Sequence, residues 1–224
     1  MFTIDPLRWS AIESLPLPTG VGDLTEGLCA VARIVYASTG RVSDLAGADC
    51  IAPTIRSYMI ALNVGLPREL RQRLGTLELA HAVLAADTSR EAEQRRAYLC
   101  ADTAVRVFAA RALRNADLPD EADTLAALAP IIDQDSANAA AYVTRYTAAT
   151  VADAAAAAHA AIGAANNASY LAARSAASAT VTAEAGASYV TRYATLYASA
   201  AADAAVAAAA WEPAFELLTA LLVA

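Results

Sequence analysis

Apolar residues recur every three or four positions along most of the chain, which is the spacing of an amphipathic helix. Over residues 23–38 the repeat is carried by Leu24, Leu28 and Val31, and Gly40 follows as a helix stop signal. Elsewhere the prolines and glycines fall between helical patterns, and we find no strand-like alternation of apolar and polar residues. The sequence therefore predicts an all-α protein.

Helix start signals place the other helices of the first 130 residues. Thr88 and Glu91 form a capping box, so a long helix is expected over residues 88–115. Another helix is expected from Pro67, although glycine at Gly75 costs about 1 kcal/mol relative to alanine. This helix carries Leu70, Leu74, Leu77 and His81. Cap and proline signals at Asp5 with Pro6, at Pro53 and at Leu118 with Pro119 open further helices, which end before Leu15, at Gly65 and at Pro130.

Residues 136–211 are mostly alanine, the best helix former, because alanine loses no side-chain entropy on folding. Glycines and an Asn-Asn pair mark the places where this segment turns or kinks. We expect three antiparallel helices, at about 137–165, 168–185 and 187–210. The C-terminal half is thus predicted to be a multi-helix bundle of long alanine-rich helices.

The change from short to long helices suggests two regions. Residues 1–88 form an N-terminal region of short helices, and residues 89–224 form the long-helix bundle. A chain of 224 residues is long enough to bury one sizeable core. We therefore expect the two regions to form one compact unit.

The alanine-rich segment contains one pentapeptide twice, as residues 142–146 and 189–193. Aromatic residues at helical spacing usually pack against alanine faces, so the favoured interpretation is that these tyrosines fill the core. The alternative is a surface for a protein partner, because tyrosine and arginine are enriched at binding hot spots. The candidate surface residues are Tyr142, Arg145, Tyr146, Tyr189, Arg192, Tyr193 and Tyr197.

Composition limits the partners of the chain. The 58% of hydrophobic residues is largely alanine, and Asp203 interrupts the longest apolar segment, so no membrane-spanning helix is expected. The net charge is −7, and the 16 basic residues are all arginines without a basic stripe, which disfavours nucleic-acid binding. The partner is therefore expected to be a protein or a second copy of the chain, and not a nucleic acid or a membrane.

The cysteines indicate a compartment. Cys29, Cys50 and Cys100 are an odd number, which is unlike a disulfide framework, and the first residues do not resemble a secretory signal. We therefore expect a reducing, cytoplasmic location.

Candidate chemistry is weak. Cys100 and a histidine, either His81 or His159, remain open as a nucleophile–base pair, but a single cysteine in a helix is usually a buried apolar residue. Neither zinc-ligand spacing nor a nucleotide-binding motif occurs, so no cofactor or metal is expected. An arginine cluster could bind an acidic partner or phosphate, or could pair with nearby glutamates on a solvated face. The cluster comprises Arg68, Arg71, Arg73, Arg90, Arg95 and Arg96.

Several short motifs occur in a fixed order. They are the residues 27–33, Ser43 with Asp44, the residues 50–53, Asn63 and the residues 93–99, followed by the alanine-rich tail. In this order they resemble an uncharacterised helical family that is common in actinobacterial and actinophage genomes. That family tends to carry Cys-x-Met-Glu in its first helix and a histidine in the following loop, which residues 30–33 and Leu45 replace here. The resemblance implies a phage or actinobacterial accessory protein, and it implies no activity.

The sequence thus favours a non-enzymatic helical interaction or assembly protein, with homo-oligomers included. An enzyme that uses Cys100 or the arginine cluster is the first alternative. Ice binding is the second, because Thr180 and Thr191 are eleven residues apart in an alanine-rich helix, as in helical antifreeze proteins.

Overall fold

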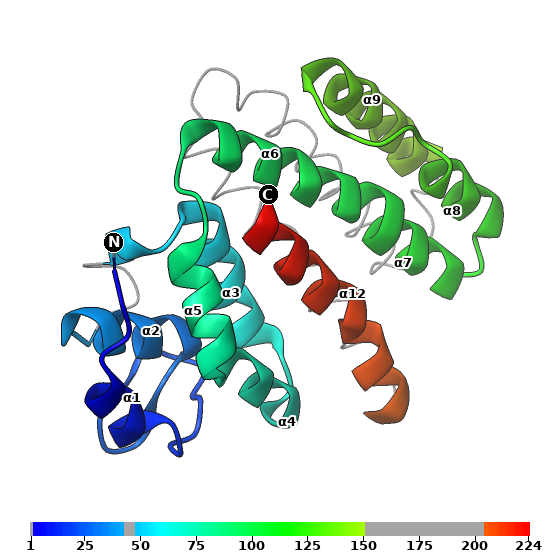
Figure 1. The fold of residues 1–224 in the computed structure, drawn as a ribbon. Helices are drawn as coiled ribbons and strands as arrows, with labels where there is room; N and C mark the ends of the chain where they lie inside the picture. Colours follow the sequence, from blue (N-terminus) through cyan, green and yellow to red (C-terminus); the bar gives the residue numbers. More distant parts are fainter. Residues whose placement is uncertain (1, 43–47, 151–203) are drawn as a thin grey trace.

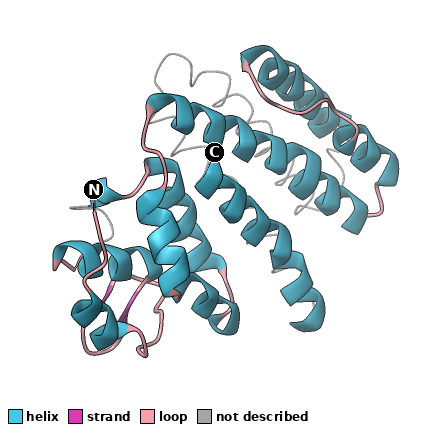
Figure 2. Cartoon of the chain, in the orientation of Figure 1, coloured by secondary structure: helices cyan, strands magenta, loops and turns pink. Residues whose placement is uncertain are grey.

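The computed structural model describes residues 2–42, 48–150 and 204–224, and these are predominantly helical (Figure 1). One small antiparallel sheet is present among them (Figure 2). The predicted all-α class is therefore confirmed. The helix expected over 168–185 lies outside the described residues, and so does most of the helix expected over 187–210. The antiparallel bundle therefore stays a prediction.

The first helix forms as its cap predicts. Helix α1 (Pro6–Ile12) begins after Asp5, whose Oδ1 accepts hydrogen bonds from the main-chain nitrogens of Leu7 and Arg8 at 2.9 and 3.2 Å. Trp9 and Ile12 lie on its buried side.

The helix expected over residues 23–38 begins late, because a hairpin occupies its first turns. Strands β1 (Gly22–Asp23) and β2 (Gly27–Leu28) pair antiparallel, and helix α2 covers only Ala30–Thr39. Both hairpin glycines have positive φ, and Asp23 Oδ1 accepts from Thr25 N and Glu26 N at 2.7 and 2.8 Å. These local bonds favour the turn over a helix.

In the middle of the chain, one predicted helix is present with its expected bounds and another is interrupted. Helix α3 (Pro53–Gly65) has the predicted bounds. The helix expected from Pro67 is divided into α4 (Arg68–Arg71), the 3₁₀ turn η2 (Gln72–Gly75) and α5 (Leu77–Ala85). A Cβ on Gly75 would lie 3.0 Å from a side-chain atom of Arg33 and of Leu17, so a larger residue here would require these side chains to shift. The break leaves Leu77 and His81 exposed instead of on a buried stripe.

The predicted long helix is continuous and contains a π-helical stretch. It comprises α6 (Arg90–Thr103), η3 (Ala104–Ala109) and α7 (Ala110–Asn115). Its cap is Ser89, whose Oγ accepts from Ala92 N at 3.2 Å, and not Thr88 as the capping box predicts. Because Asp87 Oδ1 accepts from Ser89 N at 2.8 Å, the turn before the helix places Ser89 at the cap.

The last described helices are α8 (Pro119–Ala126), α9 (Gln134–Thr150) and α12 (Ala204–Val223). The predicted helix end near residue 210 is wrong, since α12 continues through Pro213. A proline inside a helix costs about 3 kcal/mol, but burial of large apolar side chains at helical spacing offsets this cost. The buried side chains of this stripe are Trp211, Ala214, Phe215, Leu218 and Leu221.

The core lies where α3, α6 and α12 pack together (Figure 1). The buried hydroxyl of Tyr58 on α3 donates to the carbonyl oxygen of Ala214 on α12 at 3.0 Å. One hydrophobic cluster includes residues of both predicted regions. The division at residue 88 stays a prediction.

The hairpin yields a stability test. Gly22 has φ of 75°, and a Cβ there would lie 2.0 Å from the carbonyl oxygen of Gly27. We expect Gly22→Ala to lower the free energy of unfolding by about 2–4 kcal/mol, from the strained φ and the clash together. Gly20→Ala is the matched control, because nothing lies within 4 Å of its added Cβ. Urea unfolding curves that shift equally for both variants would refute this account of the hairpin.

Candidate functional site

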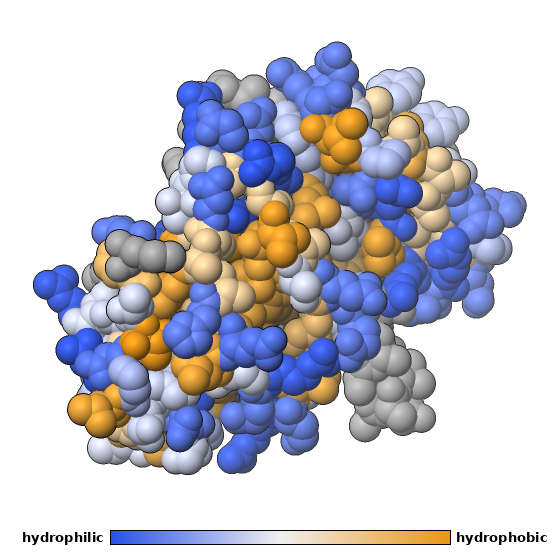
Figure 3. Space-filling view, in the orientation of Figure 1, coloured by the Kyte–Doolittle hydropathy of each residue, from blue (hydrophilic) through white to orange (hydrophobic). Residues whose placement is uncertain are grey.

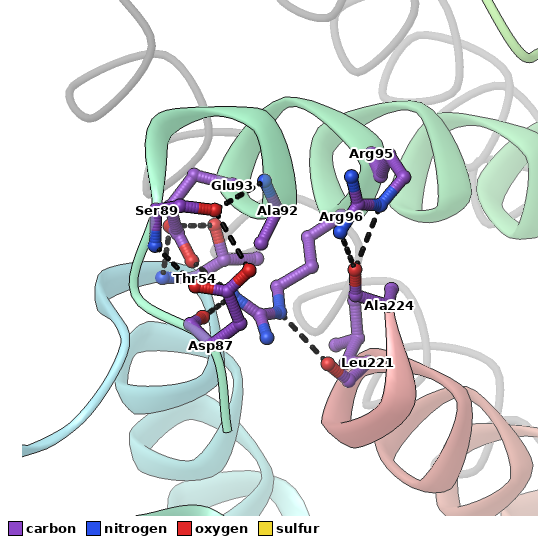
Figure 4. Close-up of polar contacts among 9 residues, drawn as sticks. All are labelled: Thr54, Asp87, Ser89, Ala92, Glu93, Arg95, Arg96, Leu221 and Ala224. Carbon is purple, nitrogen blue, oxygen red and sulfur yellow. Dashed lines mark hydrogen bonds and ion pairs between the residues drawn. The ribbon is translucent and has the colours of Figure 1, made fainter. Parts of the chain in front are cut away.

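Glu93 on α6 caps helix α3 from outside. The N-cap residue of α3 is Ala52, whose side chain has no acceptor for the first free main-chain nitrogens. Glu93 Oε2 accepts hydrogen bonds from Thr54 N at 2.9 Å and from Thr54 Oγ1 at 2.7 Å (Figure 4). A carboxylate at this position satisfies the helix end and complements its positive dipole.

Arg96, one turn later on α6, neutralises Glu93 and reaches α12. Its Nη1 donates to Glu93 Oε1 at 2.8 Å and to the carbonyl oxygen of Asp87 at 2.5 Å. Its Nε donates to the carbonyl oxygen of Leu221 at 2.8 Å (Figure 4). The side chains of Arg96 and Glu93 are only 0% and 1% exposed. The pair is thus a buried junction between α3, α6 and α12.

The neighbouring Arg95 supports the same junction from the surface. Its Nε and Nη2 donate to the main-chain oxygen of Ala224 at 2.8 and 2.5 Å. Figure 4 shows the two consecutive arginines reaching from α6 to the end of α12. Apart from Glu93, the acceptors of both guanidinium groups are main-chain oxygens, and those of Leu221 and Ala224 join α6 to the end of α12.

Two more arginines of the sequence hold the loop that follows α1. Arg33 is buried, and its Nη2 donates to the carbonyl oxygen of Leu15 at 2.6 Å. Burial lowers the pKa of the Arg33 guanidinium. Arg71 Nη1 donates to the carbonyl oxygen of Leu17 at 3.0 Å. Asn63 completes the set, because its Nδ2 donates to the carbonyl oxygen of Pro18 at 2.6 Å.

The predicted arginine cluster is therefore divided among separate partners. Arg71, Arg95 and Arg96 bind main-chain oxygens, whereas Arg73 forms an ion pair with Glu212 at 2.6 Å. The expected pairing with nearby glutamates holds for Arg96 with Glu93, but that pair is buried and not on a solvated face. A common anion site does not form from these residues.

Sequence reasoning missed the role of Glu93 and Arg96, although a signal was present. The two residues are three positions apart on one side of α6, and their helical neighbours on that side are Ala97 and Cys100. A charged pair of this spacing within a face of small apolar residues indicates a buried ion pair.

The candidate nucleophile Cys100 is buried on α6 and has 0% exposure. Burial, with the Glu93 charge as a smaller contribution, raises the pKa of its thiol to about 12, so the thiol is protonated at neutral pH. His81 is exposed on α5, whereas Cys100 is buried. His159, the other candidate base, lies outside the described residues. The geometry therefore opposes a nucleophilic role for Cys100.

The other two cysteines have local partners. Cys29 is the N-cap residue of α2, and its Sγ accepts from Ala32 N at 3.4 Å. Cys50 lies 3.8 Å from the hydroxyl of Ser38, and burial raises the pKa of its thiol. Within residues 2–42, 48–150 and 204–224, no group of three or more histidine, cysteine or acidic residues could hold a metal ion.

The first copy of the tyrosine pentapeptide lies on the exposed side of α9. Tyr142 and Tyr146 are 75% and 67% exposed, and Arg145 between them is exposed as well. The interpretation that these tyrosines fill the core is wrong for this copy. The reason is that α9 buries small side chains on its opposite side, where the helix approaches its neighbours closely. The buried residues of that side are Ala137, Ala140, Thr144 and Thr147.

The second copy of the pentapeptide, residues 189–193, lies outside the described residues. Tyr189, Arg192, Tyr193 and Tyr197 lie outside the described residues, as do Thr180 and Thr191 of the ice-binding alternative. Their roles stay predictions.

Comparison of the chain with protein-family models, with curated proteins and with solved structures found no significant match. In the part of the chain that the structure describes, no helix has the length and apolar character needed to cross a membrane.

The buried ion pair yields a second stability test. We expect Glu93→Ala to lower the free energy of unfolding by about 3–5 kcal/mol, because it leaves the Arg96 charge buried without a counter-ion. Asp123→Ala is the control, since it breaks an exposed pair with Arg114 and is expected to cost less than about 1 kcal/mol. Urea unfolding measures both. Equal losses in the two variants would contradict the role of the buried junction.

The thiols yield a reactivity test. Because Cys29, Cys50 and Cys100 are buried, we expect the native protein to react slowly with a disulfide-exchange reagent at pH 8 and the unfolded protein to react at once. The raised pKa of Cys100, about 12, keeps this thiol protonated through the pH range in which an ordinary cysteine ionises. The free energy of unfolding should accordingly fall as the pH rises above about 9, because only the unfolded chain loses this proton there. Rapid labelling of native Cys100, identified by peptide mass, would contradict this assignment.

Proposed function

We propose that the chain is a non-enzymatic helical protein that acts through protein–protein contact, including self-association. The contact surface is the exposed side of α9 formed by Tyr142, Arg145 and Tyr146, which we call the α9 face. The observation that carries the proposal is the exposure of both tyrosines, at 75% and 67%. Tyrosine and arginine are the residue types that contribute most to binding hot spots.

The two sides of α9 support this interpretation. The buried side contacts the rest of the molecule through alanine and threonine, so the tyrosines are not needed to hold the helix in place. Exposed aromatic side chains have an unfavourable contact with water, which docking against a partner removes. The three side chains lie within about 100° of the helix circumference, and one partner surface can contact all of them.

The positions of the charged and nucleophilic groups favour a binding protein over an enzyme. Glu93, Arg96 and Arg33 are buried and bound to each other or to main-chain oxygens. Cys100 is buried and protonated. The three charged groups hold helices and a loop together, and none of the four groups lines the grooves formed by the described residues around Arg73, Pro130 and Pro213.

We also propose a cytoplasmic location and a relation to actinobacterial or phage accessory proteins. All three cysteines are buried and none forms a disulfide, which supports a reducing compartment. The order of the short motifs along the chain supports the relation.

Truncation of the α9 face tests the proposal. We expect Tyr142→Ala with Tyr146→Ala to weaken association about 30-fold or more, because hot-spot truncations cost about 2 kcal/mol or more. Sedimentation velocity over a concentration series measures self-association, and quantitative capture from a host lysate compares other partners. The control is Leu7→Ala with Ile132→Ala, which removes two equally exposed apolar side chains elsewhere. The proposal fails if the parent protein and the tyrosine variant have the same mass at every concentration and capture the same proteins equally.

A further inference from the structure

A groove with a volume of about 390 Å³ lies between α5 and α12. Figure 3 shows hydrophobic side chains gathered in the hollow between these two helices. In Figure 1 α9 lies apart from α5 and α12, on the far side of α6 and α7. The apolar side chains that line the groove are Leu79, Ala82, Phe215, Leu218, Leu222 and Val223.

The charge at the edge of the groove is negative. Arg73 is already neutralised, because it forms an ion pair with Glu212 at 2.6 Å and lies 3.7 Å above the centre of the Phe215 ring. Glu78 also lines the groove and is exposed, and it has no ion-pair partner among the described residues. A ligand of this groove should therefore combine large apolar groups with one positive charge.

The α9 face has this combination. Arg145 is exposed and, like Glu78, has no ion-pair partner in the described part of the chain. It lies beside Tyr142 and Tyr146 on the helix surface, and these two residues are one helical turn, about 6 Å, apart along the axis. The apolar floor from Phe215 to Leu222 extends about 10 Å along α12, so both rings fit along it.

Resting on the proposed function, we infer that the α9 face docks into the α5–α12 groove of a second copy of this chain. Tyr142 and Tyr146 cover the apolar floor, and Arg145 pairs with Glu78. The contact joins two different surfaces, so in a pair of subunits one retains an unused groove and the other retains an unused α9 face. Association therefore extends head to tail, either as an open chain or as a closed ring.

Charge reversal tests the docking directly. We expect Arg145→Glu and Glu78→Arg each to weaken self-association about tenfold or more, since like charges across an interface are strongly unfavourable. The double variant, and an equimolar mixture of the two single variants, should recover association, because each restores an opposite-charge pair. Sedimentation velocity measures the association, and circular dichroism checks that each variant is folded. Matched controls are Arg41→Glu and Glu26→Arg, two exposed residues outside both surfaces, which should leave association unchanged.

The outcomes separate this inference from the proposed function. If Arg145→Glu weakens association and Glu78→Arg does not, the α9 face is a contact surface but the groove is not its partner, and the inference is overturned. If neither single variant changes self-association, or if the double variant does not recover it, the inference is overturned as well. A parent protein that is monomeric at every concentration also overturns the inference, while the proposed function then rests on capture of a different partner by the α9 face.

Discussion

The described fold depends on one buried ion pair. Glu93 and Arg96 carry opposite charges with almost no exposure, and an isolated charge in such a place is strongly unfavourable. Each therefore requires its partners: Thr54 at the start of α3 for Glu93, and the carbonyl oxygen of Leu221 on α12 for Arg96. Because these partners come from segments far apart in the sequence, the three helices must dock together for the bonds to Thr54 and Leu221 to form. The Tyr58 hydroxyl bond to Ala214 lies on the same α3–α12 contact and depends on the same docking.

The same use of polar groups explains how a chain rich in alanine keeps a specific arrangement. Small apolar side chains pack closely but discriminate little between alternative registers of two helices. Directional bonds from arginines supply that discrimination, as in the loop held by the buried Arg33 and the half-buried Arg71. Buried polar groups with this role are known to specify a unique arrangement in some proteins. Helix α9 differs from this arrangement, because the side chains on its buried side are small and its two exposed tyrosines face outwards.

Sequence reasoning succeeded where the determining bonds are local. Asp5 and Pro53 start helices as predicted, and Gly40 ends α2 with φ of 78°, because each acts within one helical turn. Sequence reasoning failed where residues far away in the sequence pack against a segment. At Gly75, where the predicted helix breaks, the nearest side chains are those of Arg33 and Leu17, which lie far away in sequence. The helical repeat likewise did not reveal which side of α9 is buried, because alanine and tyrosine stripes can each face a neighbour.

The buried ion pair also connects the core to the proposed docking groove. One wall of the groove is α12, and the end of α12 is held on α6 by Arg96 through Leu221 and by Arg95 through Ala224. Leu222 lies between these two anchored positions and lines the groove. Both arginines therefore help to fix the position of the apolar floor. A surface of this kind is preorganised for a partner, because the cost of ordering it is met during folding and not on binding.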